Sequence, residues 1–226
     1  MAYVKKNILG NLTGKIGNVS ARIYKGNSVF SALPGSFKMS MDENAVSRRD
    51  KFKISVKMAS AIFKSTILKE VWNYYNNSSH SSRNYVMKLN YKSFDENNMF
   101  SETNQLTPFT GTRFSYDTLV IGEENLSFQL DLSQFSFKDD TLIFVFALFQ
   151  FANSINGGLD LINYGLLESA GIPYSETNQY SVSIPFSDEV YAYSKSYTDK
   201  KLLISVVTFN SNGELANYSS SKFVNP

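Results

Sequence analysis

The side chains that could do acid–base chemistry in this sequence stand singly or as adjacent pairs. The single histidine, His80, lies in a run of asparagine and serine residues, and no Gly-x-Ser-x-Gly sequence supplies a nucleophile for it. The acidic pairs Glu123-Glu124 and Asp139-Asp140 fall where hairpin turns are expected, and acidic residues in turns are usually solvated. With no cysteine, thiol nucleophiles, thiolate metal sites and disulfides are excluded. We therefore expect no catalytic residue, no metal, no cofactor and no enzymatic activity.

One glycine-containing segment partly matches the phosphate-binding P-loop. That loop needs four residues between its glycines and a serine or threonine after the lysine, and it follows a buried strand. Here only three residues separate Gly10 from Gly14, Ile16 follows Lys15, and no apolar strand precedes the segment. The sequence therefore does not predict a nucleotide site.

Basic and acidic residues are unevenly distributed along the 226 residues. Residues 1–70 hold thirteen lysines and arginines against four acidic residues, whereas residues 71–226 hold nine against sixteen. Because the basic residues are spread out, they fit a solvated surface better than a nucleic-acid-binding block. Two alternatives remain open: the basic part faces nucleic acid or an acidic protein surface, or identical copies complement each other head to tail.

The first 35 residues predict a β-hairpin with glycine-rich flanks. Val19–Tyr24 and Ser28–Leu33 are extended segments, and Lys25-Gly26-Asn27 forms the turn between them. A lone two-stranded hairpin is marginal in water, so it should dock on its own helix or on a neighbouring subunit. The residues expected to make assembly contacts are Gly10, Gly14, Lys15, Gly17, Arg22, Lys25, Arg48 and Arg49.

Helical periodicity follows this hairpin. Ser40 and Glu43 fit a capping box, and apolar steps of three and four residues predict one amphipathic helix over 41–75, with a break near Ser47–Asp50 as an alternative. The stripe comprises Phe52, Val56, Ala59, Phe63, Ile67, Val71 and Tyr75. A helix of that length needs a partner, which favours oligomerisation or packing on a larger body. A second helix is predicted over Arg83–Tyr91, and Ser93–Thr112 is irregular.

From residue 114 the apolar residues alternate with a period of two. Seven strands are predicted, and Tyr191–Tyr197 is an eighth candidate. The seven are Phe114–Ile121, Leu126–Leu132, Thr141–Phe151, Leu159–Glu168, Gln179–Ile184, Lys201–Asn210 and Ala216–Val224. Seven short strands over about 110 residues are typical of an immunoglobulin-like sandwich.

The expected fold is therefore α+β, with an N-terminal β-hairpin and long helix followed by an all-β immunoglobulin-like sandwich. We expect an assembly region over residues 1–112 and the sandwich over 113–226. The longest apolar run, Leu142–Phe149, is too short to cross a bilayer, and no signal peptide follows the first lysines. No membrane partner is expected.

Tyrosines gather near the predicted loops of the sandwich. They are Tyr174, Tyr180, Tyr191, Tyr193 and Tyr197. Exposed together, they would suit a carbohydrate- or receptor-binding surface, because aromatic rings are good anchors. Buried, they would belong to the core or to an interface.

The string Asn7–Val19, Asn-Ile-Leu-Gly-Asn-Leu-Thr-Gly-Lys-Ile-Gly-Asn-Val, resembles the opening of a family of uncharacterised proteins from Bacteroidota and their phages. Ser31-Ala32-Leu33-Pro34 is similar to a later motif of that family, although Phe30 stands where an arginine is usual. Arg48–Phe52 and Val206–Ser219 are similar to its basic helix segment and its final hairpin. The resemblance implies the same two-part plan but no established activity.

The abundance of Asn, Lys, Ser, Tyr and Phe is similar to that of proteins from crAss-like phages of Bacteroidota. The resemblance implies a structural virion protein, foremost a tail or collar ring subunit that contacts copies of itself and neighbouring virion proteins through its N-terminal region. It would be made in the host cytoplasm and located in the virion. The alternatives are a capsid auxiliary protein, a carbohydrate- or receptor-binding immunoglobulin-like module, and a nucleic-acid-associated protein, which is not favoured.

Overall fold

The computed structural model describes residues 2–4, 13–32, 39–76, 81–135, 141–155 and 162–225. The chain divides into two compact units, Met1–Val46 and Ser47–Pro226. This division falls within the first helix, whereas the sequence analysis drew its boundary between residues 112 and 113. The difference arises because the helices share a core with the C-terminal strands.

The N-terminal unit is an antiparallel sheet of four strands in the order β1-β4-β3-β2. They are β1 (Ala2–Val4), β2 (Gly14–Ile16), β3 (Val19–Tyr24) and β4 (Asn27–Ala32). The predicted hairpin is confirmed as β3 and β4, which pair from Val19 opposite Ala32 to Tyr24 opposite Asn27. Lys25 and Gly26 form its turn with φ of 49° and 78°, a conformation that glycine adopts without strain.

Two helices occupy the segment in which one long helix was predicted. α1 (Glu43–Ile62) and α2 (Thr66–Tyr75) are separated at residues 63–65, so the single helix over 41–75 is wrong, as is the alternative break near Ser47–Asp50. Ser65 begins α2 as its N-cap, since its hydroxyl accepts a hydrogen bond from the Leu68 N–H at 3.3 Å. The apolar spacing continues across the break, which is why periodicity did not reveal it.

The first turn of α1 is capped by a different residue from the one expected. The carboxylate of Asp42 accepts a hydrogen bond from the Ala45 N–H at 3.3 Å, whereas the hydroxyl of Ser40 accepts from the Asp42 N–H. The predicted capping box of Ser40 and Glu43 is therefore wrong. The other predicted helix is confirmed as α3 (Ser82–Tyr91).

The C-terminal part of the chain forms two antiparallel sheets. The three-stranded sheet contains β5 (Ser115–Ile121), β6 (Asn125–Asp131) and β10 (Gln179–Pro185) in the order β10-β6-β5. The six-stranded sheet contains β7 (Leu142–Ser154), β8 (Ile162–Glu168), β9 (Ile172–Pro173), β11 (Tyr197–Phe209), β12 (Leu215–Tyr218) and β13 (Lys222–Val224). Its central pair, β7 and β11, is in register from Leu142 opposite Phe209 to Ser154 opposite Tyr197.

The predicted strands are largely confirmed, and the fold is α+β. Two details differ. The last predicted strand, Ala216–Val224, is interrupted and forms β12 and β13. The eighth candidate, Tyr191–Tyr197, is wrong: this segment mostly belongs to α4 (Asp188–Ser196), whose N-cap Ser187 accepts a hydrogen bond from the Val190 N–H.

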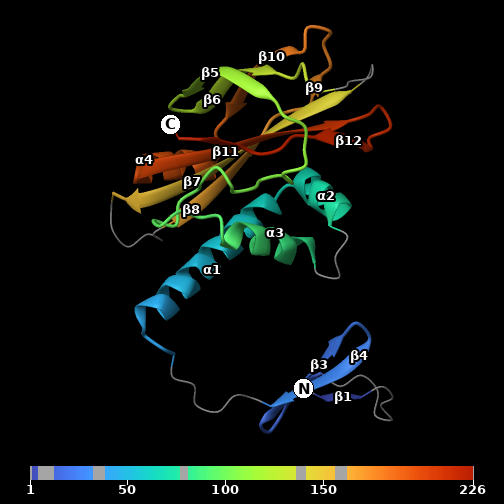
Figure 1. Cartoon of the computed structure of the whole chain (residues 1–226), viewed down its shortest axis with the longest axis vertical. Helices are drawn as coiled ribbons and strands as arrows, with labels where there is room; N and C mark the ends of the chain where they lie inside the picture. The colour runs from blue at the N-terminus through green and yellow to red at the C-terminus, as the bar shows by residue number, and fades with distance from the viewer. Residues whose placement is uncertain are drawn as a thin grey trace. The chain divides into compact units, whose positions relative to one another are not determined.

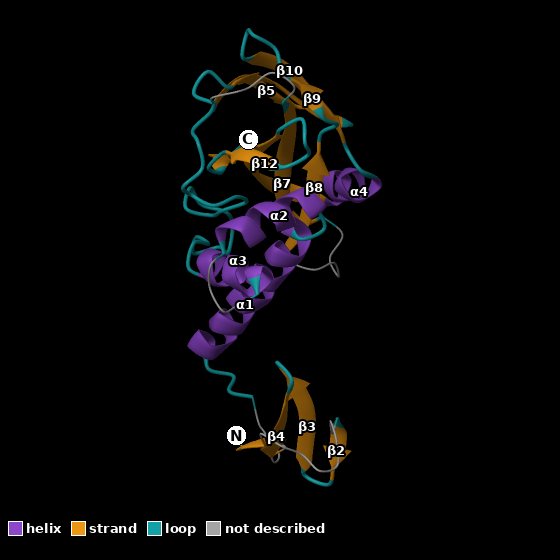
Figure 2. Cartoon of the chain, turned by 90° about the vertical axis from the view of Figure 1, so that its right-hand side faces the viewer, coloured by secondary structure: helices purple, strands orange, loops and turns teal. Residues whose placement is uncertain are grey.

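The six-stranded sheet is buried on both faces. Val145, Ala147 and Phe149 of β7 belong to a core shared with the three-stranded sheet, whereas Phe146 and Leu148 belong to a core shared with the helices. Figure 1 shows the resulting layers, with β5, β6 and β10 on one side of this sheet and the helices α2 and α3 on the other. Figure 2 shows α4 beside β8, at the edge of the sheet. A strand that is apolar on both faces, as predicted for Leu142–Phe149, suits this central layer.

Candidate functional site

The N-terminal sheet exposes basic side chains on one face. Lys15 of β2 lies opposite Ser20 of β3. Ser20 and Arg22 are two residues apart on β3, so their side chains share a face. Lys15 and Arg22 therefore lie on the same face of the sheet. Both side chains are exposed, as is Lys25 in the turn. The structure thus places two of the predicted contact residues, Lys15 and Arg22, on one face, with Lys25 in the turn at the end of the hairpin.

This sheet buries little of its own apolar surface. Among the described side chains of residues 13–32, those of Ala21, Ser28 and Val29 are buried. Ile23 is 41% exposed and Tyr24 is 54% exposed. Because sheets are stabilised mainly by burying one face, apolar residues left in water indicate a surface that another chain can cover.

The remaining predicted contact residues are placed differently. Gly14 and Gly17 have φ of 124° and 58°, which gives a backbone reason for glycine at both positions. Gly10 lies outside the described residues. Arg48 and Arg49 belong to α1 in the second unit, so the structure does not group them with the N-terminal sheet.

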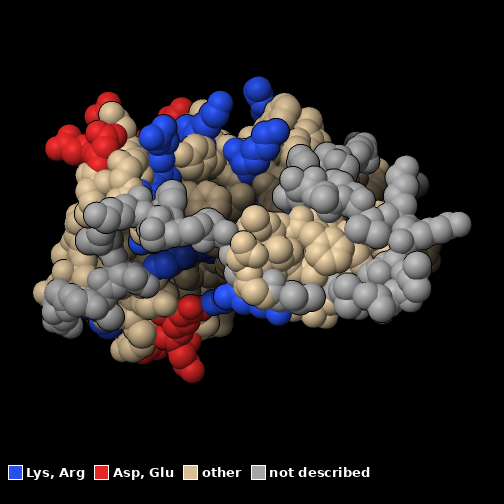
Figure 3. Space-filling model, turned by 90° about the horizontal axis from the view of Figure 1, so that it is seen from below, with Lys and Arg blue, Asp and Glu red and all other residues tan. Residues whose placement is uncertain are grey.

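The beginning of α1 is only partly covered by its own unit. No residue from Ser47 to Lys53 is buried, and the first buried residue of the helix is Ile54. Phe52 is 51% exposed, so its predicted place in the apolar core stripe is wrong. The ion pair of Lys53 with Asp50 is 4.0 Å long and exposed, and pairs of that kind contribute little to stability. Figure 3 shows lysine and arginine side chains (blue) at several places on the surface.

The loop tyrosines do not form one exposed surface. Tyr180 and Tyr197 are buried, and Tyr193 packs edge-on against Tyr197 at 5.9 Å between ring centroids. The Tyr180 hydroxyl donates to the Ser175 carbonyl at 3.1 Å. These rings therefore serve packing, and Tyr191, at 41% exposed, is turned to solvent.

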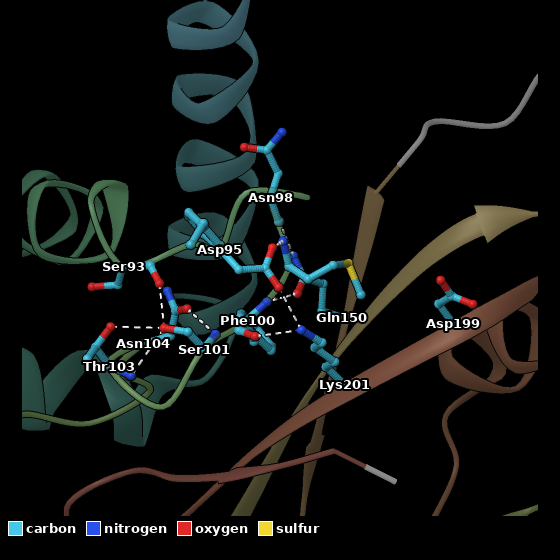
Figure 4. A network of polar contacts seen from close by, with 12 residues as sticks. Ser93, Asp95, Asn98, Phe100, Ser101, Thr103, Asn104, Gln150, Asp199 and Lys201 are labelled. Atoms are coloured by element: carbon cyan, nitrogen blue, oxygen red, sulfur yellow. Dashed lines mark hydrogen bonds and ion pairs between the residues drawn. The ribbon is translucent and has the colours of Figure 1, made fainter.

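A groove of about 940 Å³ lies between α1 and the ends of β7, β8 and β11. An ion pair of 2.8 Å joins Lys201 of β11 to Asp95 at this groove, as Figure 4 shows. Burial alone would raise the pKa of Asp95, but hydrogen bonds from Lys201 and from the Met99 N–H outweigh it, so the pKa lies below its ordinary value. Lys201 also donates to the Phe100 carbonyl at 3.0 Å.

Gln150 of β7 ties the same segment to the sheet from within the core. Its Oε1 accepts a hydrogen bond from the Phe100 N–H at 2.5 Å, and its Nε2 donates to the Asn98 carbonyl at 2.9 Å and to the Tyr164 hydroxyl at 3.1 Å (Figure 4). Burial raises the pKa of Tyr164 well above its ordinary value, so this hydroxyl stays protonated. The charged and polar groups of this network hold the irregular segment over residues 93–112 on the sheet, which is a structural role.

Sequence reasoning missed this network. Gln150 follows an unbroken apolar run, and its partners are up to 52 residues away in the chain. The one signal was a glutamine inside a strand predicted to be buried on both faces, because a buried amide needs partners.

Comparison with models of known protein families and with curated protein sequences gives no match to this chain. In the described ranges, no helix combines the length and apolar character that crossing a bilayer requires. Within the same ranges, no three His, Asp or Glu side chains are grouped so that they could hold a metal ion.

Proposed function

We propose that the protein is a structural subunit, not an enzyme, which assembles with copies of itself and with neighbouring proteins through its N-terminal region. The observation that carries this proposal is the N-terminal sheet, which leaves Ile23 in water on one face and leaves Tyr24 in water on the other face, where Lys15 and Arg22 also lie. A second chain that covered either the Ile23 or the Tyr24 side chain would remove apolar surface from water. Each Å² of apolar surface buried in this way stabilises the contact by about 25 cal/mol. The proposed mechanism is packing and charge complementarity.

The proposed setting of this assembly is a phage virion, in which the protein is a tail or collar ring subunit. This part of the proposal rests on the resemblance of Asn7–Val19 and on the two-part plan of the chain. A capsid auxiliary protein is the nearest variant, because it would use the same kind of contact.

In such an assembly the two packed sheets would face outward or act as a spacer between neighbouring contacts. We propose that these sheets form an immunoglobulin-like sandwich. In such sandwiches the first, second and fifth strands share one sheet, and the third, sixth and seventh share the other. The main strands here, taken in the order β5, β6, β7, β8, β10, β11 and β12, divide in the same way. β8, the fourth strand, pairs with β7 in the second sheet.

A single substitution on the N-terminal sheet tests the proposed function. Ile23→Asp places a charge on the exposed apolar face and should lower the mass of the assembled protein in light scattering, because a carboxylate is costly to bury in a contact. Asn27→Asp adds the same charge at the first residue of β4, on the opposite face of the sheet, and is the matched control. Equal masses for wild type, Ile23→Asp and Asn27→Asp would contradict a contact through this face.

A further inference from the structure

The outer face of α1 combines an exposed aromatic ring with basic side chains. At about 3.6 residues per turn, Arg49, Phe52 and Lys53 point away from the core side of the helix, which carries Ile54 and Met58. The Phe52 residue is 51% exposed, and the side chain of Lys53 is 76% exposed. We call Arg49, Phe52 and Lys53 the α1 face.

A second surface of the same unit has the opposite charge and its own exposed ring. The backbone N–H of Phe186 donates to the Glu124 carbonyl at 2.7 Å, which fixes the β5–β6 turn beside the start of α4. We call the exposed residues gathered there the α4 corner; they are Glu123, Glu124, Asp188, Glu189 and Tyr191.

Lysines neutralise part of this corner. Lys195 lies 3.7 Å from Glu123 and 5.5 Å from the centroid of the Tyr191 ring, and Lys64 lies 2.6 Å from Glu189. In the described part of the chain, Glu124 and Asp188 form no ion pair. Two carboxylates beside an exposed aromatic ring therefore remain available to a basic partner.

We propose that the α1 face of one copy docks on the α4 corner of the next copy. This inference rests on the proposed function, because it adds a second contact between copies to the one proposed for the N-terminal sheet. Arg49 and Lys53 would lie against Glu124 and Asp188, and the Phe52 ring would be covered in the contact. Complementary charge fixes the register of such contacts, and burial of the ring supplies part of their affinity.

The α1 face and the α4 corner of one chain lie apart, so a contact between them has to join two copies. Figures 1 and 2 both show the first turns of α1 projecting away from the sheets, whereas α4 lies against them. The contact therefore joins unlike surfaces, head to tail, and a contact of this type produces a closed ring or an open filament. Two α1 faces meeting each other would instead bring like charges together, which disfavours a symmetric pair.

Reversing the charge of each surface in the full-length protein tests the proposal. The variants are R49E/K53E on the α1 face and E124K/D188K on the α4 corner; K69E/K88E reverses two exposed lysines on α2 and α3 as the matched control. Each test variant should weaken self-association, measured by light scattering over a concentration series, by about tenfold or more. A mixture of the two test variants should associate again, because one chain keeps its α1 face and the other keeps its α4 corner.

The possible outcomes distinguish a failure of the docking between the α1 face and the α4 corner from a failure of self-assembly itself. If the wild type assembles and both test variants assemble equally well, self-assembly stands and this docking is overturned. If the wild type is a monomer at every concentration, both are overturned. If the wild type stays monomeric and binds a double-stranded DNA oligomer through Arg49 and Lys53, the α1 face belongs to nucleic acid.

Discussion

Replacing Gln150 with leucine should strongly destabilise the second unit. The substitution places an apolar side chain of similar size in β7 and removes every hydrogen bond that the amide makes. The Phe100 N–H and the Tyr164 hydroxyl would be left in the core, and the Asn98 carbonyl would lose its amide donor. A buried polar group without a partner costs about 1–3 kcal/mol.

The net effect is smaller than the sum of these costs. The tyrosine hydroxyl can rotate, and the buried leucine returns roughly 1–2 kcal/mol of hydrophobic stabilisation. We therefore expect the free energy of unfolding to fall by about 2–4 kcal/mol. With a denaturant slope of roughly 2 kcal/mol per molar urea, the unfolding midpoint should shift by about 1–2 M.

Urea unfolding followed by tryptophan fluorescence measures this change directly. Trp72 is the single tryptophan, is fully buried and shares its core with Phe100, so its emission reports on the affected region. Gln129→Leu is the matched control, because Gln129 is exposed on β6. It should change the free energy of unfolding by about 0.5 kcal/mol or less. Equal midpoints for Gln150→Leu and Gln129→Leu would refute the stabilising role of the network.

Two further predictions concern other contacts of the second unit. Because the folded pKa of Asp95 is lowered, the stability it contributes is present above the unfolded pKa of about 3.9 and is lost as the pH falls through the folded value. Asp95→Asn should therefore flatten the acid dependence of the free energy of unfolding, and an unchanged profile would contradict the ion pair with Lys201. Gly111→Ala would place Cβ 2.2 Å from the Ser219 backbone, so it should cost about 2 kcal/mol or more by urea unfolding. Gly171→Ala, whose nearest contact is a ring atom at 3.3 Å, is its milder control, and equal losses would contradict the clash.

The elements that could be predicted from sequence are those with a clear local pattern. Leu142–Phe149 is apolar throughout and forms the central strand β7, and Lys25-Gly26 marks the turn of the β3–β4 hairpin. Local signals also existed where the predictions were wrong. Ser187 with Asp188 and Glu189 is a helix start, which tyrosine-rich alternation obscured at α4.

Contacts between distant segments could not be predicted in the same way. Nothing near Gln150 in sequence specifies that it binds the backbone of residues 98 and 100. Nor could periodicity show that Phe52 lies beyond the packed part of α1, because an exposed stripe and a buried one have the same spacing. The basic character of the N-terminal region was visible, whereas its division between two units was not.

The mass of the purified full-length protein in light scattering, beside that of the chain lacking residues 1–35, tests self-assembly through the N-terminal region most directly. The truncation removes β1–β4 and leaves the second unit with both of its cores intact. The account predicts a defined oligomer for the full chain and a lower mass after truncation. A monomer in both samples, or the same oligomer in both, would contradict it.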